Sequence, residues 1–407
     1  MGFAEEFRRL PMASWMSAAR ESTRRDVDDV LGKRGALSVA DFAVLLSPAG
    51  TGAIEGMARR SASMTRQRFG RVIRLFAPLY LSNECINNCS YCGFSRDNPI
   101  LRVTLTRDDV VREARALRSE GFRSVLLVAG EHPRFVSDGY LRDCVNLVRG
   151  EVPAVSIEVG PMEAAEYRPI VEAGADGLVV YQETYDRDVY HEVHTFGPKK
   201  DFDWRLGTPE RGYAAGFRRL GLGALFGLAD WRWEALSVAA HASWLFRHCW
   251  KAFLTISLPR LRPCAGEFQP RTLLSDPEMV QLVCAFRLLF PDAGLVLSTR
   301  EPAKLRDGLM PLGITLMSAG SHTEPGGYTG AGSGQVHYTR GGRIEAIPGE
   351  STEGIPAAGR VTAATGQFEI ADARTAGEVA RAIERLGFEP VWKDWDVALA
   401  SAPAGQT

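Results

Sequence analysis

Three cysteines within eight residues form the part of this sequence best suited to chemistry. Cys85, Cys89 and Cys92 follow the apolar run 75–81 in a C-x3-C-x2-C arrangement. Thiolates so close together, on a loop that leaves a strand, can bind one iron–sulfur cluster, but a [4Fe–4S] cube has four irons and usually takes four cysteines. Three ligands therefore leave one iron open to a small molecule.

Two other interpretations of these cysteines fit less well. A disulfide would leave an odd thiol, and nothing else in the sequence indicates an oxidising compartment. Structural zinc prefers four closed ligands, usually in two separated pairs. The remaining cysteines are spaced in a way that suits no second cluster; they are Cys144, Cys249, Cys264 and Cys284. An iron–sulfur site is therefore favoured over both.

The cysteine spacing, with an aromatic residue directly before the last cysteine, resembles the signature of radical S-adenosylmethionine (SAM) enzymes. The resemblance implies that the open iron binds the amino and carboxylate groups of SAM and that the cluster's electron cleaves SAM to a 5′-deoxyadenosyl radical. It also implies that Tyr91 packs near the adenine, the alternative being an ordinary loop aromatic. The expected cofactors are a [4Fe–4S] cluster and SAM.

The elements that position this loop follow a βα pattern. From about residue 71, short apolar strands alternate with amphipathic helical stretches. One is capped by Thr106, and another begins at Ser275 with a proline at an early helix position. Eight strands are predicted, at 75–81, 124–128, 155–159, 177–181, 222–228, 252–258, 294–298 and 313–317. Eight units closing on themselves predict an α/β fold, a (β/α)8 TIM-type radical SAM barrel with its active site at the carboxyl ends of the strands. The alternative is a six-unit open barrel with the last two strands in an appendage.

The rest of the chain is predicted to extend this barrel at both ends. Residues 1–70 read as a helical N-terminal extension, in which Ser38 and Asp41 resemble a capping box. The barrel is expected over 71–328, a flexible Gly-rich insert over 329–362, and a C-terminal helix and tail over 363–407. Two tryptophans near the end suggest that the tail packs on the barrel.

Composition excludes several classes of function. The 407 residues are 45% hydrophobic with a net charge of −1, which gives no global attraction to nucleic acid or anionic membranes. The sequence contains no run apolar enough to span a bilayer and no signal-peptide core. Together with the odd number of cysteines, these features predict a cytoplasmic enzyme with neither a nucleic-acid nor a membrane partner.

Residues after the second strand are candidates for binding SAM. The segment Ala129-Gly130-Glu131 resembles the Gly-Gly-Glu segment with which radical SAM enzymes bind the SAM amino group, although alanine replaces the first glycine. A carboxylate suits an ammonium group, and glycine allows close backbone approach. Gly130 and Glu131 are therefore expected at the cofactor.

Further polar residues follow the third and fourth strands. Glu158 and Glu183 would be costly at strand ends unless paired, and the ribose or methionine part of SAM is the expected partner. Gln182, beside Glu183, is assigned to the same group. Arg205 offers a fork for the SAM carboxylate. The alternatives are an ion pair with an arginine for Glu183 and a solvated helix-end position for Arg205.

The seventh and eighth strands end in residues suited to an amino-acid carboxylate. Arg300 supplies charge, and Ser318 and Ser321 supply neutral donors. A salt bridge to Glu301 or to another acid at the rim is the alternative for Arg300.

A narrower resemblance extends over most of residues 71–328 and resumes at the last helix. The segments 76–83, 89–95, 180–185, 259–264, 297–301 and 391–396 together resemble the 2-iminoacetate synthase family, the tyrosine lyases of bacterial thiamine thiazole synthesis. The resemblance implies hydrogen abstraction from the tyrosine amino group and cleavage of the Cα–Cβ bond to 2-iminoacetate and p-cresol. It also implies that Tyr80 lies by the substrate amine, that Arg300 holds the carboxylate, and that Ser318 assists with Ser321 close by.

Other functions remain open at this point. A tryptophan lyase of indolic-acid synthesis would use an arginine and a serine in the same way to bind its substrate. A non-catalytic iron–sulfur scaffold would need only the cluster. The tyrosine lyase of hydrogenase cofactor assembly is disfavoured because no cysteine follows Cys284. The expected partners are L-tyrosine, an electron donor such as flavodoxin or ferredoxin, and thiazole synthase, to which the unstable imine would pass.

Overall fold

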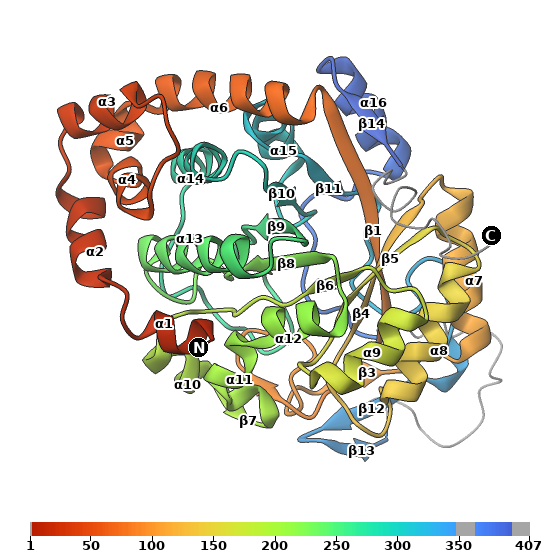
Figure 1. Cartoon of the computed structure of the whole chain (residues 1–407). Coiled ribbons are helices and arrows are strands. Elements are labelled where there is room, and N and C mark those ends of the chain that lie inside the picture. Colours follow the sequence, from red (N-terminus) through yellow and green to blue (C-terminus); the bar gives the residue numbers. More distant parts are fainter. Residues whose placement is uncertain (1, 347–362, 393–407) are drawn as a thin grey trace, which may run out of the picture.

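A closed ring of eight parallel strands forms the centre of the protein (Figure 1). The computed structural model describes residues 2–346 and 363–392. The strands are β1 (Val72–Ser82), β4 (Ser124–Ala129), β5 (Ala154–Glu158), β6 (Gly177–Val179), β8 (Arg219–Gly223), β9 (Phe253–Ser257), β10 (Gly294–Leu297) and β11 (Leu316–Ser318). They pair in this order, and β11 pairs with β1 to close the ring. The (β/α)8 barrel is confirmed, and the six-unit open barrel is wrong.

The fifth predicted strand is displaced along the chain. The sequence predicted it at 222–228, but β8 ends at Gly223. The apolar run continues past the sheet because residues 224–229 are buried at the mouth of the barrel, where Ala224 and Phe226 form only single bridges to Glu183 and Arg260. These residues are apolar because they are buried, and the sequence pattern therefore resembled a strand although they form no β-ladder.

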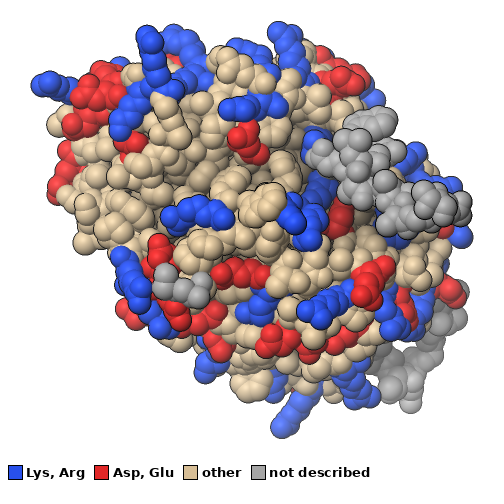
Figure 2. Space-filling model, in the orientation of Figure 1, with Lys and Arg blue, Asp and Glu red and all other residues tan. Residues whose placement is uncertain are grey.

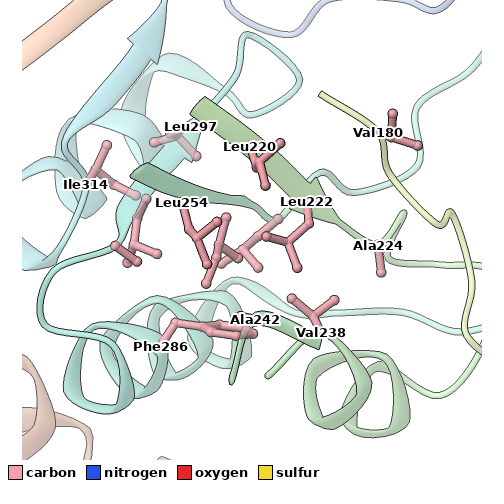
Figure 3. Packing of buried hydrophobic residues seen from close by; sticks show 14 of the residues in the cluster. Val180, Leu220, Leu222, Ala224, Val238, Ala242, Leu254, Phe286, Leu297 and Ile314 are labelled. Atoms are coloured by element: carbon pink, nitrogen blue, oxygen red, sulfur yellow. The ribbon is translucent and has the colours of Figure 1, made fainter. Parts of the chain in front are cut away.

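Helices cover the outside of the ring (Figure 1). They are α7 (Arg107–Ser119), α8 (Asp138–Arg149), α9 (Ala164–Glu172), α12 (Thr208–Ala215), α13 (Trp231–His248), α14 (Asp276–Leu289) and α15 (Ala303–Leu309). Capping boxes at Thr106 and Ser275 start α7 and α14; the N-cap at Thr106 and the early proline of α14 are as the sequence predicted. Figure 3 shows one part of the core, where Leu254 lies between the sheet and Ala242 and Phe286 of α13 and α14.

Six N-terminal helices form a group that packs against α13 and α14 (Figure 1). They are α1 (Phe3–Phe7), α2 (Met12–Glu21), α3 (Arg24–Gly32), α4 (Val39–Leu45), α5 (Pro48–Gly52) and α6 (Ile54–Phe69). The capping box that Ser38 and Asp41 resembled is confirmed at the start of α4. None of the helices in the described part of the chain is long and apolar enough to cross a membrane. Figure 2 shows basic and acidic side chains interspersed over the visible face.

A buried polar network fastens α1 to the barrel. Phe3 stacks on His241 with ring centroids 4.1 Å apart, and the Tyr185 hydroxyl lies 2.9 Å from His241 Nδ1. The Glu234 carboxyl accepts hydrogen bonds from the Thr184 hydroxyl and, at 2.8 Å, from the Tyr185 backbone N–H. Burial raises the pKa of Glu234 to about 8.

This raised pKa predicts a pH-dependent stability that Glu234→Gln should remove. At low pH the Glu234 carboxyl is protonated in both the folded and the unfolded protein. Between its ordinary pKa of 4.5 and its folded-state pKa of about 8, the carboxyl ionises only in the unfolded protein. Stability is therefore lost as pH rises through this window, by up to about 1.4 kcal/mol per pH unit. The melting temperature of the variant minus that of the wild type should increase from pH 5.5 to pH 8. The same difference should stay constant for Glu5→Gln, at an exposed position on α1.

Two small antiparallel sheets lie at the mouth of the barrel, at the bottom of Figure 1. One pairs β2 (Asn88–Cys89) with β7 (His194–Phe196), and the other has the order β13 (Arg343–Glu345), β12 (His337–Arg340), β3 (Ile100–Arg102). The hairpin that β12 and β13 form lies in the first half of the segment 329–362, which was expected to be a flexible insert. It forms because Gly341 and Gly342 both have positive φ, which suits a two-residue hairpin turn. The second half, 347–362, lies outside the described residues.

The C-terminal segment returns to both ends of the barrel. Residues 364–372 cross the mouth, and α16 (Ala376–Arg385) then leads to β14 (Glu389–Val391), which pairs with the start of β1 at the opposite end. Trp392 packs against Phe122 with ring centroids 5.3 Å apart. The last tryptophan, Trp395, lies outside the described residues.

Candidate active site

The carboxyl ends of the strands surround one cavity of about 940 Å³, counted with its opening to solvent. The structure brings together most of the site residues that the sequence predicted. Those lining the cavity are Tyr80, Tyr91, Cys92, Glu158, Glu183, Arg300, Ser318 and Ser321. The lining residues that the sequence prediction did not assign to the site include Lys199, Gln367 and Phe368.

The three cysteines stand on the loop after β1, at the edge of this cavity. All three are free thiols, and burial together with the neighbouring sulfur atoms raises the pKa of Cys85 and of Cys89. Such thiols ionise readily only beside a cation, which bound iron supplies. Across residues 2–346 and 363–392, no three Cys, His, Asp or Glu side chains are close enough to share a single ion. The C-x3-C-x2-C arrangement suits a cluster, in which each thiolate binds a different iron.

A buried arginine holds both ends of the cysteine loop. Arg102, at the end of β3, is 2% exposed. Its guanidinium donates to the carbonyl of Asn83 before the loop, at 2.5 Å, and to those of Phe94 and Ser95 after it, at 3.0 and 2.7 Å. Nε donates to the Thr339 hydroxyl on β12 at 2.7 Å. The small sheet at the mouth therefore supports the loop that carries the thiols.

Gly130 and Glu131 contact this loop from behind. A Cβ on Gly130 would lie 2.2 Å from the carbonyl oxygen of Glu84, so only glycine fits there. The Glu131 carboxylate accepts from the Asn87 side-chain amide at 2.7 Å, and its carbonyl accepts from Ile86 N–H at 2.8 Å. Both residues line a separate hollow outside the central cavity. Gly130 and Glu131 thus position the cysteine loop, and the Glu131 carboxylate already accepts a hydrogen bond from Asn87.

Glu183 is held by two cations. Its Oε1 lies 2.7 Å from Lys199 Nζ and 3.2 Å from an Arg205 nitrogen, and its φ of 73° is rare for a residue with a side chain. Burial alone would raise the pKa of Glu183, but Lys199 and Arg205 lower it. The ion-pair alternative for Glu183 is therefore what the structure has. Arg205, within α11 (Phe202–Leu206), also donates to the Tyr181 carbonyl at 2.7 Å.

Gln182 points away from the cavity. Its buried side-chain amide donates to the Phe202 carbonyl at 3.3 Å, which ties the end of the fourth barrel strand to α11. Gln182 is not among the residues that line the central cavity.

Tyr91 and Glu158 both line the cavity, but only Tyr91 has a hydrogen-bond partner for its side chain. The Tyr91 hydroxyl lies 2.7 Å from Nε2 of His194, whose pKa burial lowers to about 3, so the neutral imidazole accepts from the phenol. The Glu158 carboxyl has no hydrogen bond or ion pair with any described residue. Burial, and then the charge of Glu183, raise the pKa of Glu158 to about 7. Glu158 is thus an acceptor left open to a ligand.

Arg300 is a second open group. Its neighbour Glu301 pairs with Arg260 at 3.0 Å, so the expected alternative salt bridge does not form. Arg300 has no ion pair with any described residue, and its guanidinium stacks on the Phe368 ring at 3.4 Å from the centroid. Ser318 Oγ accepts from Thr299 N–H at 3.1 Å, and the buried Ser321 Oγ has no partner among the residues described.

Comparison with known proteins decides the family. The chain is 40% identical over 401 residues to 2-iminoacetate synthase of Escherichia coli (strain K12), which covers 98% of each chain. The chain belongs to the 2-iminoacetate synthase family. The identity to 2-iminoacetate synthase of Salmonella typhimurium, also over 98% of each chain, is likewise 40%. Residues 79–237 match the radical SAM superfamily model, and residues 257–389 match the biotin and thiamin synthesis associated domain.

Solved structures share the architecture of this 2-iminoacetate synthase family member. HydG, a maturase of the [FeFe]-hydrogenase, is 28% identical with a TM-score of 0.83, and the match covers 97% of this chain and 81% of that one. HydG from Carboxydothermus hydrogenoformans is 30% identical with a TM-score of 0.75, over 96% and 82%. Methylornithine synthase (PylB), at 22% identity and a TM-score of 0.66, shares the fold.

The residues that sequence reasoning missed carry weak sequence signals. Lys199 stands in Gly-Pro-Lys-Lys, which reads as an ordinary surface turn, although its Nζ lies 5.5 Å from the Tyr91 ring. Gln367 and Phe368 lie in a stretch without periodicity, far along the chain from every predicted strand. The double glycine at 341–342 was the usable signal for the hairpin that supports Arg102.

We expect Glu158→Gln to weaken SAM binding about tenfold at pH 8, because a carboxylate accepts hydrogen bonds from hydroxyls more strongly than an amide does. The folded pKa of about 7 adds a pH dependence. Wild-type affinity should rise from pH 6 to pH 8 as Glu158 ionises, and the affinity of the variant should not. Equilibrium dialysis of SAM against the anaerobic reconstituted protein measures both. Glu172→Gln, at an exposed glutamate of α9, is the matched control. A flat wild-type profile would remove Glu158 from the SAM site.

Proposed function

We propose that this protein is a radical SAM lyase that cleaves the Cα–Cβ bond of L-tyrosine to 2-iminoacetate and p-cresol, with 5′-deoxyadenosine and methionine as co-products, for thiamine thiazole synthesis. The observation that carries the proposal is the meeting, in one cavity, of the cysteine loop and Arg300, which has no ion pair with any residue of the described ranges. Identity to two 2-iminoacetate synthases over 98% of the chain supports it.

The cluster and SAM, when bound, supply a 5′-deoxyadenosyl radical at the mouth of the barrel. Cys85, Cys89 and Cys92 would hold the cluster. For SAM we propose Tyr91 and Glu158 as contacts, and Gly130 and Glu131 as the support behind the cysteine loop. Glu183 and Arg205 act through the Lys199 ion-pair network that shapes this wall of the cavity.

The substrate side of the cavity carries the complementary groups. The Arg300 guanidinium and the hydroxyls of Ser318 and Ser321 suit an amino-acid carboxylate, and Tyr80, buried beside them, would contact the amine. Fixing the carboxylate fixes which N–H faces the radical source and which C–C bond aligns with it. Orientation is the main contribution that a protein makes when the cofactor supplies the reactivity.

The partners follow from this reaction. The enzyme acts on a small molecule and needs an electron donor, for which we propose a flavodoxin or ferredoxin in the cytoplasm. The imine product hydrolyses in water, so we propose its transfer to thiazole synthase. Addition of the lyase should stimulate thiazole formation by that enzyme more than an equal supply of free product does.

Anaerobic reconstitution with iron and sulfide, followed by incubation with SAM, dithionite and L-tyrosine, tests the function. Formation of 5′-deoxyadenosine and p-cresol is expected. A methylated indolic acid from tryptophan would instead indicate the tryptophan lyase, and absence of SAM cleavage would indicate a scaffold.

A further inference from the structure

A strap, residues 364–372, closes over the mouth of the barrel. Backbone hydrogen bonds of 2.9 to 3.0 Å tie it to four different loops. They run from Gly93 N–H to the Gln367 carbonyl, from Gln367 N–H to Thr323, from Glu369 N–H to Pro263, and from Ala371 N–H to Thr299. The strap therefore links the cysteine loop to the loops that follow β9, β10 and β11.

The strap lies directly on the cysteine loop. Gly93 follows the last cysteine, and a Cβ there would lie 2.5 Å from the Gln367 carbonyl oxygen and 2.7 Å from that of Gly366. The two backbones approach so closely that any larger residue at 93 would push the strap away. The position of Gln367 is thus set by the cysteine loop itself.

The Gln367 side chain connects two parts of the proposed machinery. Its Oε1 accepts a hydrogen bond from the Tyr80 hydroxyl at 2.8 Å, and its Nε2 lies 3.8 Å from Cys92 Sγ. An amide is suited to this bridge because it is uncharged and offers an acceptor to the phenol and a donor to the sulfur. A carboxylate could accept from Tyr80 but would add negative charge beside a thiolate.

We infer that Gln367 is a positioning residue for tyrosine cleavage: it fixes the Tyr80 hydroxyl, and with it the substrate amine, relative to Cys92. The inference rests on the proposed function. Because misplacement by about 1 Å can cost about a hundredfold in rate, loss of this bridge should impair hydrogen abstraction more than SAM cleavage. The variant should consume SAM without cleaving tyrosine.

The test compares Gln367→Ala and Gln367→Glu with Gln335→Ala, which alters an exposed glutamine after the barrel. Reconstituted proteins are assayed for iron content, for 5′-deoxyadenosine formed per p-cresol, and for the change that tyrosine causes in the electron paramagnetic resonance signal of the reduced cluster with SAM. We expect normal iron in all three. In Gln367→Ala the ratio of 5′-deoxyadenosine to p-cresol should rise at least tenfold, and tyrosine should no longer change the paramagnetic resonance signal. Gln367→Glu should show a smaller effect on both measurements, and Gln335→Ala should show none.

A double-mutant cycle with Tyr80→Phe separates positioning from general structural damage. If Gln367 acts through Tyr80, adding Gln367→Ala to Tyr80→Phe should raise the ratio no further. An unchanged ratio in Gln367→Ala, or fully additive effects, would overturn the inference. Should Gln367→Ala bind too little iron, Gln367→Leu, which keeps much of the volume of the side chain but has no hydrogen-bonding group, decides in the same way. Absence of p-cresol from the wild type would instead overturn the proposed function.

Discussion

Replacing Arg300 with alanine is expected to lower kcat/KM for tyrosine by about 10²–10³-fold without changing the iron content of the protein. Arg300 lines the cavity half-buried, stacks on Phe368 and has no ion pair with any described residue, so its charge is available to the substrate. Two hydrogen bonds from a guanidinium to a carboxylate contribute about 3–4 kcal/mol together. Single-turnover assays with SAM and tyrosine, alongside the absorption spectrum of the cluster, measure the effect.

Two further variants define what Arg300 does. Arg300→Lys keeps the charge but loses the planar fork, so it should recover only part of the activity. Arg271→Ala removes an arginine whose partner, Glu192, is exposed on the rim, and it should behave as the wild type. Full tyrosine turnover by Arg300→Ala would remove Arg300 from the substrate site.

The barrel could be predicted from the sequence because its strands are short apolar runs that alternate with amphipathic helical stretches. That pattern located all eight strands and failed only in detail. At 222–228 the residues are apolar because they are buried, not because they all pair in the sheet. Residues 224–229 fill the mouth of the barrel without joining the hydrogen-bond ladder of β8. At 337–345 the Gly-rich composition suggested an irregular segment, although a double glycine between β-branched and aromatic residues also suits a hairpin.

The candidate site was predictable as far as strand ends determine it. The carboxyl ends of parallel strands converge, so Glu158, Arg300 and Ser318 meet in one cavity. The direction of a side chain after a strand is not determined in this way. Gln182 faces α11 and Glu131 faces Asn87, so neither side chain lines the cavity in which Glu158 lies.

The contacts made over long sequence distances could not be predicted. Gln367 reaches Tyr80 across 287 positions, through a strap that has neither hydrophobic periodicity nor a recognisable motif. Only the requirement for glycine at 93, directly after the last cysteine, reflects the strap in the sequence, and that requirement is visible only once the two backbones are seen together.

Arg102→Met is expected to reduce the iron bound after anaerobic reconstitution to less than half of the wild-type amount. The substitution leaves the carbonyls of Asn83, Phe94 and Ser95 buried without their donor, at about 1–3 kcal/mol for each group. It also removes a buried cation close to Cys85 and Cys92. Iron and acid-labile sulfide per chain, measured with the melting temperature of the apoprotein, report the result.

The comparison with Arg96→Met isolates the role of Arg102. Arg96 lies on the same loop but points outward and stacks on Phe196, with its guanidinium carbon 4.4 Å from the ring centroid. Its replacement should leave iron binding intact. Arg102→Lys, which can satisfy some of the carbonyls and keeps the charge, should bind an intermediate amount of iron. If Arg102→Met bound iron as the wild type does, the cysteine loop would keep its shape without the β3–β12 sheet, and the hairpin at 337–345 would need another explanation.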